Sequence, residues 1–246
     1  MRNFKLVLSY DGTRYKGWQR LGGGENTLQA KIESVLSRMV EAPVELIGSG
    51  RTDAGVHALG QVANFHAKTE LSADEVRSYL RKYLPEDIGV LSVEEVDGRF
   101  HSRLNAVRKT YRYRIWNSSE PCVFERKYVW VLPEKLDVSS MRAASDVLKG
   151  THDFLAFCSN KHFKKSSVRN VYDICIHRDG NELVIDVTGN GFLYNMVRII
   201  VGTLVEIGRG ERQVSSLENI LESRLRENAG AMAPAHGLYL LEVQYS

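Results

Sequence analysis

Short strand-like segments alternate with helix-like segments along the whole chain, and this alternation limits the folds that are available to it. Residues 4–10 place alternate apolar side chains on one face, which is typical of a half-buried strand. Helix-like spacing of apolar residues follows Asn26 and again follows Ser72. The order predicts an α+β fold with antiparallel strands and with helices on one face of the sheet.

Local signals predict where several of these elements begin and end. Three capping-box-like pairs precede apolar helical runs: Asn26 and Gln29, Ser72 and Glu75, and Ser215 and Glu218. A helix over 138–149 is expected to stop at Gly150, because glycine is a favoured residue after a helix C-terminus. Asp179-Gly180-Asn181 lies between two strand-like runs and predicts a hairpin.

The second part of the chain repeats the order of the first, which predicts two halves. The 246 residues are enough for two domains of about 120 residues each. The expected halves are residues 1–105, with a glycine-rich Asp loop, and residues 106–246, with a Tyr-Arg-Tyr strand and a helix that carries Arg198. Because no low-complexity linker separates them, we expect a shared sheet or a tight interface.

Composition excludes several classes of protein. The hydrophobic fraction of 43% is too high for a disordered chain. The longest apolar run, near 196–205, contains Arg198 and is too short to span a membrane, and the N-terminus lacks the pattern of a signal peptide. The net charge of +3 does not by itself indicate nucleic acid, so the distribution of charge along the chain is more informative.

Metal and disulfide chemistry have little support in the sequence. Cys122, Cys158 and Cys175 are widely spaced and form no CxxC pair, so neither a zinc cage nor a disulfide framework is expected. Reduced thiols favour a cytoplasmic protein. His57 and His66 have no third ligand at a suitable spacing, and we interpret them as loop or core histidines rather than metal ligands.

Residues 48–57 form the most informative segment, because glycines bracket Arg51 and Asp53. Glycine permits tight turns and close backbone approach, so a shaped loop is expected. The nearby guanidinium favours the ionised form of the carboxyl group, and an ionised Asp on a rigid loop suits a nucleophile or a general base. An ordinary turn is the alternative, since Asp and Gly are common turn residues.

A basic and aromatic segment, residues 99–116, contains six Lys or Arg residues and no acid. In a strand, Tyr111 and Tyr113 would share one face, with arginines on the other. Arginines neutralise phosphates and aromatic rings stack on unpaired bases, so the pattern fits RNA with a flipped nucleotide. A solvated basic strand with core tyrosines fits equally well. A second basic segment, residues 161–169, would suit an extended polyanion.

Arg198 is the single charge in the apolar helix-like stretch 191–202. A buried guanidinium needs an anionic partner, and Asp53 is a candidate. In the alternative interpretation, Arg198 lies at the helix edge with its head group in water.

Motifs along nearly the whole chain are similar to those of the tRNA pseudouridine synthase A family. The most specific is GRTDAGVHALGQVANF at 50–65. The others occur in the same order, at 9–20, 27–36, 100–117, 150–158, 187–204 and 237–245. The resemblance implies two ferredoxin/RRM-like α+β halves that share a central antiparallel sheet with a basic active-site cleft.

The resemblance also implies an activity and a role for five residues. The expected reaction is isomerisation of uridine to pseudouridine at positions 38, 39 and 40 of the tRNA anticodon stem-loop, by a homodimer without metal or organic cofactor. Asp53 is the implied catalytic residue, and Tyr111 is expected to stack on the target base. The resemblance associates Arg51 with base flipping, Arg103 with tRNA contact and Arg198 with pairing to the catalytic Asp.

Two other functions fit parts of the pattern. A non-catalytic RNA-binding protein would use the same basic, aromatic strand. A nucleoside hydrolase would release free uracil, but such enzymes usually need a second carboxylate or a metal, and no suitable carboxylate stands out near Asp53. For the isomerase, attack of Asp53 on C1′ and abstraction of the 2′ proton both remain open.

Overall fold

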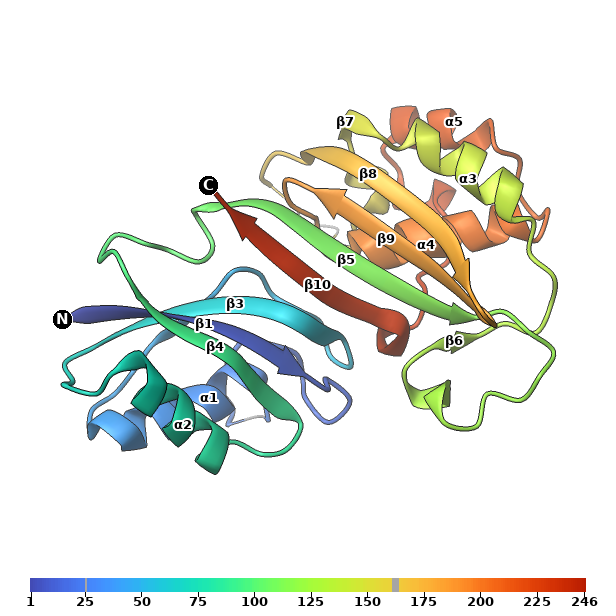
Figure 1. Ribbon diagram of the computed structural model, residues 1–246. Helices are drawn as coiled ribbons and strands as arrows, with labels where there is room; N and C mark the ends of the chain where they lie inside the picture. The colour runs from blue at the N-terminus through green and yellow to red at the C-terminus, as the bar shows by residue number, and fades with distance from the viewer. Residues whose placement is uncertain (25, 161–163) are drawn as a thin grey trace. The chain divides into compact units, whose positions relative to one another are not determined.

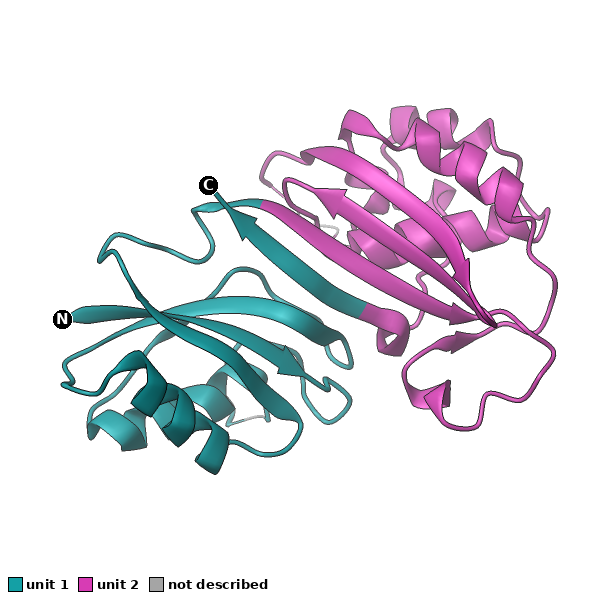
Figure 2. Cartoon of the chain, in the orientation of Figure 1, with its two compact units in different colours: residues 1–107, 239–246 teal, residues 108–238 magenta. Residues whose placement is uncertain are grey.

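The computed structural model describes residues 1–24, 26–160 and 164–246, and the chain divides into two compact units (Figures 1 and 2). Unit 1 comprises residues 1–107 and 239–246, and unit 2 comprises residues 108–238. A division at 105/106 would place the C-terminal strand in the second half, whereas this strand groups with unit 1, where it pairs with β3.

Unit 1 is an antiparallel sheet with two helices on one face (Figure 1). Its elements are β1 (Arg2–Tyr10), α1 (Leu28–Val40), β2 (Leu46–Gly48), β3 (His57–Ala67), α2 (Ala73–Tyr83), β4 (Ile88–Val96) and β10 (Leu238–Tyr245). The strand order is β4-β1-β3-β10, with β2 also paired to β3. Among the described strands of this unit, β10 alone runs parallel to its neighbour, β3. Phe4, Leu6 and Leu8 are fully buried, as the alternation in β1 predicts.

Unit 2 has the same general design. Its elements are β5 (Ala106–Trp116), β6 (Trp130–Val131), α3 (Val138–Val147), β7 (Gly150–Asp153), β8 (Val168–Asp179), β9 (Glu182–Gly189), α4 (Met196–Gly208) and α5 (Ser216–Ser223). The order β5-β9-β8-β7 is antiparallel throughout. The predicted hairpin joins β8 to β9, with Gly180 at a φ of 57°. The α+β class is thus confirmed in both units.

The helix N-termini confirm one predicted capping box and correct another. The Ser72 side chain accepts from the Glu75 amide, and the Glu75 carboxylate accepts from the Ser72 amide, so α2 has a complete box. In α1 the N-cap is Thr27 rather than Asn26. The amide side chain of Gln29 does not cap the helix but binds buried groups. The prediction was wrong here because tertiary contacts use Gln29.

These caps allow a matched stability test. Ser215 precedes α5 but its side chain makes no capping hydrogen bond, contrary to the prediction. We expect Ser72→Ala to lower the free energy of unfolding by about 1 kcal/mol, because the Glu75 amide loses its acceptor, the Ser72 hydroxyl. Ser215→Ala should leave it unchanged within about 0.3 kcal/mol. Urea denaturation of the two variants measures the difference, and equal losses would contradict the assignment of the caps.

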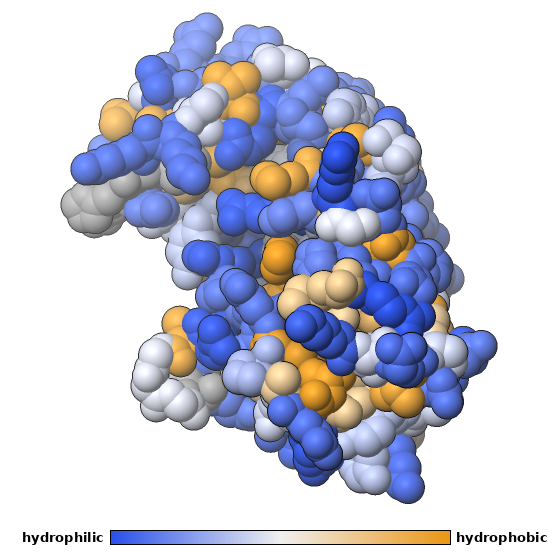
Figure 3. Space-filling model, turned by 90° about the vertical axis from the view of Figure 1, so that its left-hand side faces the viewer, coloured by the Kyte–Doolittle hydropathy of each residue, from blue (hydrophilic) through white to orange (hydrophobic). Residues whose placement is uncertain are grey.

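Large hydrophobic side chains are exposed at scattered positions along the described residues. No helix in the described ranges is long and apolar enough to cross a membrane. Among the described residues, Phe124 is the most exposed of the large hydrophobic side chains, at 88%, followed by Met1 and Leu104 at 80% and 75%. On the face seen in Figure 3, hydrophobic side chains form patches between hydrophilic ones. Small hydrophobic patches of this kind are normal for a folded surface.

Candidate active site

Asp53 lies in unit 1 on the loop that joins β2 to β3, called here the Asp53 loop (residues 49–56). A second loop, residues 11–18, packs against it backbone to backbone. The Trp18 amide donates to the Thr52 carbonyl at 2.9 Å. The residue directly before Asp53 is therefore held by a hydrogen bond from another part of the chain.

Two glycines make this close approach possible. A Cβ atom at Gly12 would lie 2.0 Å from the Val56 carbonyl oxygen, which is far inside van der Waals contact. Gly17 has a φ of 93°, and a Cβ there would lie 2.7 Å from the Thr52 carbonyl oxygen. Any larger residue would push the two loops apart, so the shape of the Asp53 loop depends on both positions.

A buried polar network supports the Asp53 loop from below. The Tyr10 and Thr52 hydroxyl groups are 2.8 Å apart. The Gln61 side chain donates to the Gly50 carbonyl at 3.0 Å and accepts from the Ser49 hydroxyl at 2.7 Å. Tyr10, Thr52, Ser49 and Gln61 are all buried. Satisfied buried networks fix one geometry, because any displacement leaves a polar group without a partner.

Arg51 and Asp53 are exposed to different degrees on this loop. Arg51 is exposed, and its Nε donates to the Gln19 side chain at 3.0 Å. Asp53 is half-buried, and its backbone carbonyl accepts from the Val56 amide at 3.1 Å, which closes a tight turn. The predicted shaped loop is confirmed, and it presents a guanidinium and a carboxylate two residues apart.

Arg103 also belongs to unit 1, on a turn between β4 and β5. Its side chain is exposed, and its amide donates to His101 Nδ1 at 3.2 Å. The preceding residue, Ser102, is fully buried. An exposed cation next to a buried anchor suits contact with a phosphate group.

Tyr111 lies on β5 in unit 2 and is 9% exposed. Its ring meets Phe192 edge to face, with 5.2 Å between the centroids. Tyr113 is fully buried, and its hydroxyl donates to the Pro234 carbonyl at 2.8 Å. The two tyrosines share the buried face of β5, as predicted.

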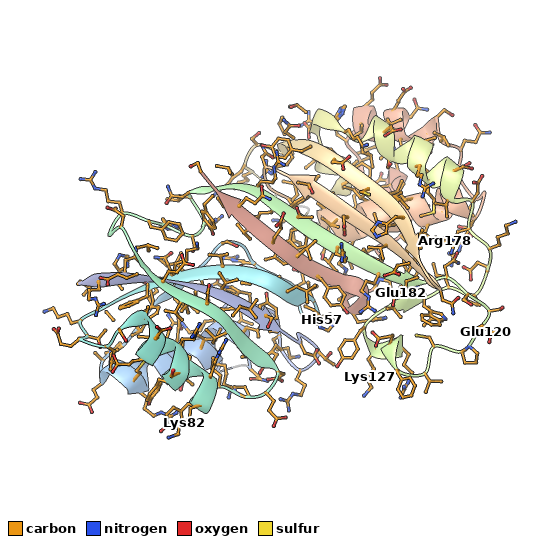
Figure 4. All side chains as sticks on the ribbon, in the orientation of Figure 1. His57, Lys82, Glu120, Lys127, Arg178 and Glu182 are labelled. Atoms are coloured by element: carbon orange, nitrogen blue, oxygen red, sulfur yellow. The ribbon has the colours of Figure 1, made fainter. Side chains whose placement is uncertain are left out.

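The arginines of the same strand are engaged in ion pairs. Arg112 binds Asp186 through two hydrogen bonds of 2.8 and 2.7 Å. Arg114 binds Glu182 in the same bidentate way, and Figure 4 labels Glu182 at the start of β9. Each guanidinium already binds a carboxylate. These two arginines therefore fit the alternative interpretation, in which the strand is structural and does not bind phosphate.

Arg198 lies in the first turn of α4 and is half-buried. Within unit 2 its Nε donates to the Ala233 carbonyl at 2.7 Å, and its Nη1 donates to Asn195 Oδ1 at 3.0 Å. Burial raises the pKa of Tyr113, and the charge of Arg198 partly opposes that shift. The structure thus brings Arg198 and Tyr113 together around residues 233–234.

The second basic segment is described only in part. Residues 161–163 lie outside the described residues. Lys164 and Lys165 are exposed, whereas burial lowers the pKa of Arg169, whose guanidinium donates to the Ser166 and Val168 carbonyls. Two cations of this segment therefore face solvent.

His57 and His66 make contacts within the protein that are typical of structural histidines. His57 is 2% exposed, stacks on Tyr239 with centroids 4.9 Å apart, and accepts from the Gly12 amide through Nδ1 (Figure 4). His66 Nε2 lies 3.2 Å from the Gly98 carbonyl. The described part of the chain contains no group of three or more His, Cys, Asp or Glu residues that could hold a metal ion.

Comparison with known proteins identifies the family. A family model described as tRNA pseudouridine synthase matches residues 6–105 and 144–246. A tRNA pseudouridine synthase A 2 from Bacillus cereus is 51% identical over 245 residues, covering 100% of both chains. Proteins named tRNA pseudouridine synthase A from Bacillus sp. strain KSM-64 and from Acetivibrio thermocellus are 52% and 46% identical over the same length, again with full coverage.

The chain belongs to the tRNA pseudouridine synthase family. The resemblance inferred from the motifs is confirmed, and so is the class of enzyme, an isomerase. Membership favours catalysis over the non-catalytic and hydrolytic alternatives. The matched ranges contain Arg51, Asp53, Arg103 and Arg198, and Tyr111 lies between them.

For this synthase, sequence reasoning missed the residues that support the Asp53 loop. Gln61 is fully buried on β3, and Tyr10 ends β1. A signal for Gln61 was present, because GQVANF places polar residues inside an otherwise apolar strand. A buried polar side chain needs partners, so such a position marks a network.

Proposed function

We propose that this protein converts uridine to pseudouridine at positions 38, 39 and 40 of the tRNA anticodon stem-loop, with Asp53 as the catalytic group. The observation that carries the proposal is full-length identity of about one half to proteins named tRNA pseudouridine synthase A. The rigid support of the Asp53 loop adds to it, because catalytic groups need a fixed geometry.

The reaction breaks the N1–C1′ bond of uridine, turns the base, and joins C5 to C1′. The base must first leave the stack, which costs a few kcal/mol. We assign Arg51 to holding the extruded nucleotide, because it is exposed on the same loop as Asp53. Tyr111 is assigned to stacking on the base, with Phe192 against the edge of its ring. Arg103 is assigned to contact with the tRNA backbone.

Asp53 acts on the sugar in one of two ways. As a nucleophile it attacks C1′ and the N1–C1′ bond breaks; C5 then displaces the carboxylate from C1′, and the C5 proton is lost to water. As a general base it takes the 2′ proton while the N1–C1′ bond breaks, which gives a glycal; uracil then adds back through C5 as Asp53 returns the proton to C2′, and the C5 proton is lost to water. Both routes need an ionised carboxylate, and we assign Arg198 to maintaining it as an ion-pair partner.

We further propose that the enzyme works as a homodimer in the cytoplasm. Its relatives are bacterial proteins whose names assign them to tRNA. The three cysteines in the chain are free thiols, which suits a reducing compartment.

Tritium release tests the activity. An unmodified tRNA transcript with tritium at uridine C5 is incubated with the protein, and the proposal expects tritium in water while the nucleotide stays in the chain. Free uracil would indicate hydrolysis, and binding without release of either would indicate a binding protein. Either of these two results contradicts the proposal.

Substitution of Tyr111 tests its assigned contact with the base. We expect Tyr111→Ala to lower kcat/KM for tRNA by roughly 10- to 100-fold, because stacking on an aromatic ring stabilises a base by about 1–3 kcal/mol. Tyr83→Ala, at a partly exposed tyrosine on α2, is the control and should stay near wild type. Equal rates for the two variants, measured by tritium release, would remove Tyr111 from the site.

A further inference from the structure

Ser102, the residue before Arg103, is tied to three strands of unit 1. Its amide donates to Asn64 Oδ1 on β3 at 2.9 Å, and its hydroxyl donates to the Ile47 carbonyl on β2. Its carbonyl accepts from the Tyr245 hydroxyl on β10 at 2.7 Å. Each polar group of Ser102 is thus held from a different direction, so the backbone beside Arg103 has little freedom.

The turn that precedes Ser102 is anchored by the same polar cluster. Asn3 Nδ2 donates to the carbonyls of Asp97 and Phe100, both at 2.9 Å. Asn64 Nδ2 donates to Asn3 Oδ1 at 3.0 Å. Asn3 and Asn64 are buried on neighbouring strands, β1 and β3. Buried side chains of the unit 1 sheet therefore hold the backbone of residues 97–102 in place.

Tyr245 closes this cluster at the end of β10. Its ring packs on Phe100 with centroids 5.1 Å apart, and Lys5 Nζ lies 5.7 Å from its centroid. Burial raises the pKa of Tyr245, and the Ser49 side chain partly offsets this. Ser49 begins the Asp53 loop and binds Gln61 in the network beneath it. The hydroxyl of Tyr245 thus holds the Arg103 turn through the Ser102 carbonyl.

We propose that Tyr245 is a positioning residue for tRNA binding, which fixes Arg103 on the sheet of unit 1 through the Ser102 carbonyl. The proposal rests on the proposed contact of Arg103 with the tRNA backbone. A flexible arginine loses conformational entropy when it binds a phosphate, and a fixed backbone reduces that loss. Removal of the Tyr245 hydroxyl leaves the Ser102 carbonyl without this donor and frees the turn.

A double-mutant cycle tests this coupling. The affinity of unmodified tRNA is measured over a range of salt concentrations for wild type, Tyr245→Phe, Arg103→Ala and the double variant. We expect Tyr245→Phe to weaken binding about fivefold, as for loss of one hydrogen bond. Both Tyr245→Phe and Arg103→Ala should make the dependence of log affinity on log salt concentration less steep, by up to about 1 in slope. In the Arg103→Ala background, Tyr245→Phe should have no further effect.

A purely structural role predicts a different pattern. General loss of stability would weaken binding equally in both backgrounds and leave the salt slope at its wild-type value, and this result would overturn the proposal. Unchanged binding by Tyr245→Phe would also overturn it. Tyr83→Phe, which removes a hydroxyl from α2, is the control and should match wild type in affinity and slope. If Arg103→Ala changes neither the affinity for tRNA nor the salt slope, Arg103 does not contact the tRNA backbone, and the inference about Tyr245 fails as well.

Because the cycle measures binding, it is independent of turnover. Failure of the inference leaves tritium release by the wild-type enzyme unaffected. Failure of the proposed function appears instead as absence of tritium release, whatever the outcome of the cycle.

Discussion

Asp53→Asn is expected to abolish formation of pseudouridine while the protein still binds tRNA. The amide has nearly the same shape as the carboxylate, but it is neither an adequate nucleophile for C1′ nor a base for the 2′ proton. We expect tritium release to fall at least about 10³-fold. Affinity for tRNA should change by less than about threefold, because the cations proposed to contact phosphate are intact.

The control for this substitution is Asp74→Asn. Asp74 is an exposed carboxylate of the same unit, in the first turn of α2, and pairs with Arg77 at 3.2 Å. It should keep wild-type turnover. Single-turnover tritium release separates chemistry from product release in both variants. Turnover near the wild-type rate in Asp53→Asn would end the assignment of this residue.

Gly12→Ala is expected to reduce turnover strongly, although Gly12 is not assigned any contact with tRNA. The new Cβ would lie 2.0 Å from the Val56 carbonyl oxygen, so residues 11–18 and the Asp53 loop must move apart. A displacement of about 1 Å at a catalytic group lowers the rate by about 10²-fold. The steric conflict should also lower the free energy of unfolding by about 1–3 kcal/mol.

Gly22→Ala provides the matched control, because a Cβ at Gly22 meets nothing within 4 Å. It should retain wild-type turnover and stability. The measurements are kcat by tritium release, at a temperature where circular dichroism shows both variants folded, and thermal unfolding. Wild-type kcat in Gly12→Ala would show that the contact between the two loops does not position Asp53.

The sequence predicted the elements whose signals are local. Alternation in β1, the capping box at Ser72 and the hairpin at Gly180 each depend on residues a few positions apart. The glycine-rich segment around Asp53 was predicted as a shaped loop for the same reason. Its own residues determine which conformations are allowed.

Features that depend on distant partners could not be predicted in this way. The Gln29 side chain donates to the Leu46 carbonyl, 17 residues further along the chain, and so does not cap α1. Arg112 forms an ion pair with Asp186, 74 residues away. The sequence of this strand suggested phosphate binding, but the ion pair gives Arg112 a structural role. Tyr245 meets Ser102 only because β10 joins the sheet of unit 1.

Mapping of pseudouridine in tRNA at single-nucleotide resolution tests the central claim most directly. Unmodified transcripts with uridine at positions 38, 39 and 40 are incubated with wild-type protein or with Asp53→Asn, and pseudouridine is then located. We expect pseudouridine at these positions with wild type and none with the variant. Unmodified uridine after wild-type treatment, or pseudouridine only elsewhere in the tRNA, would contradict it.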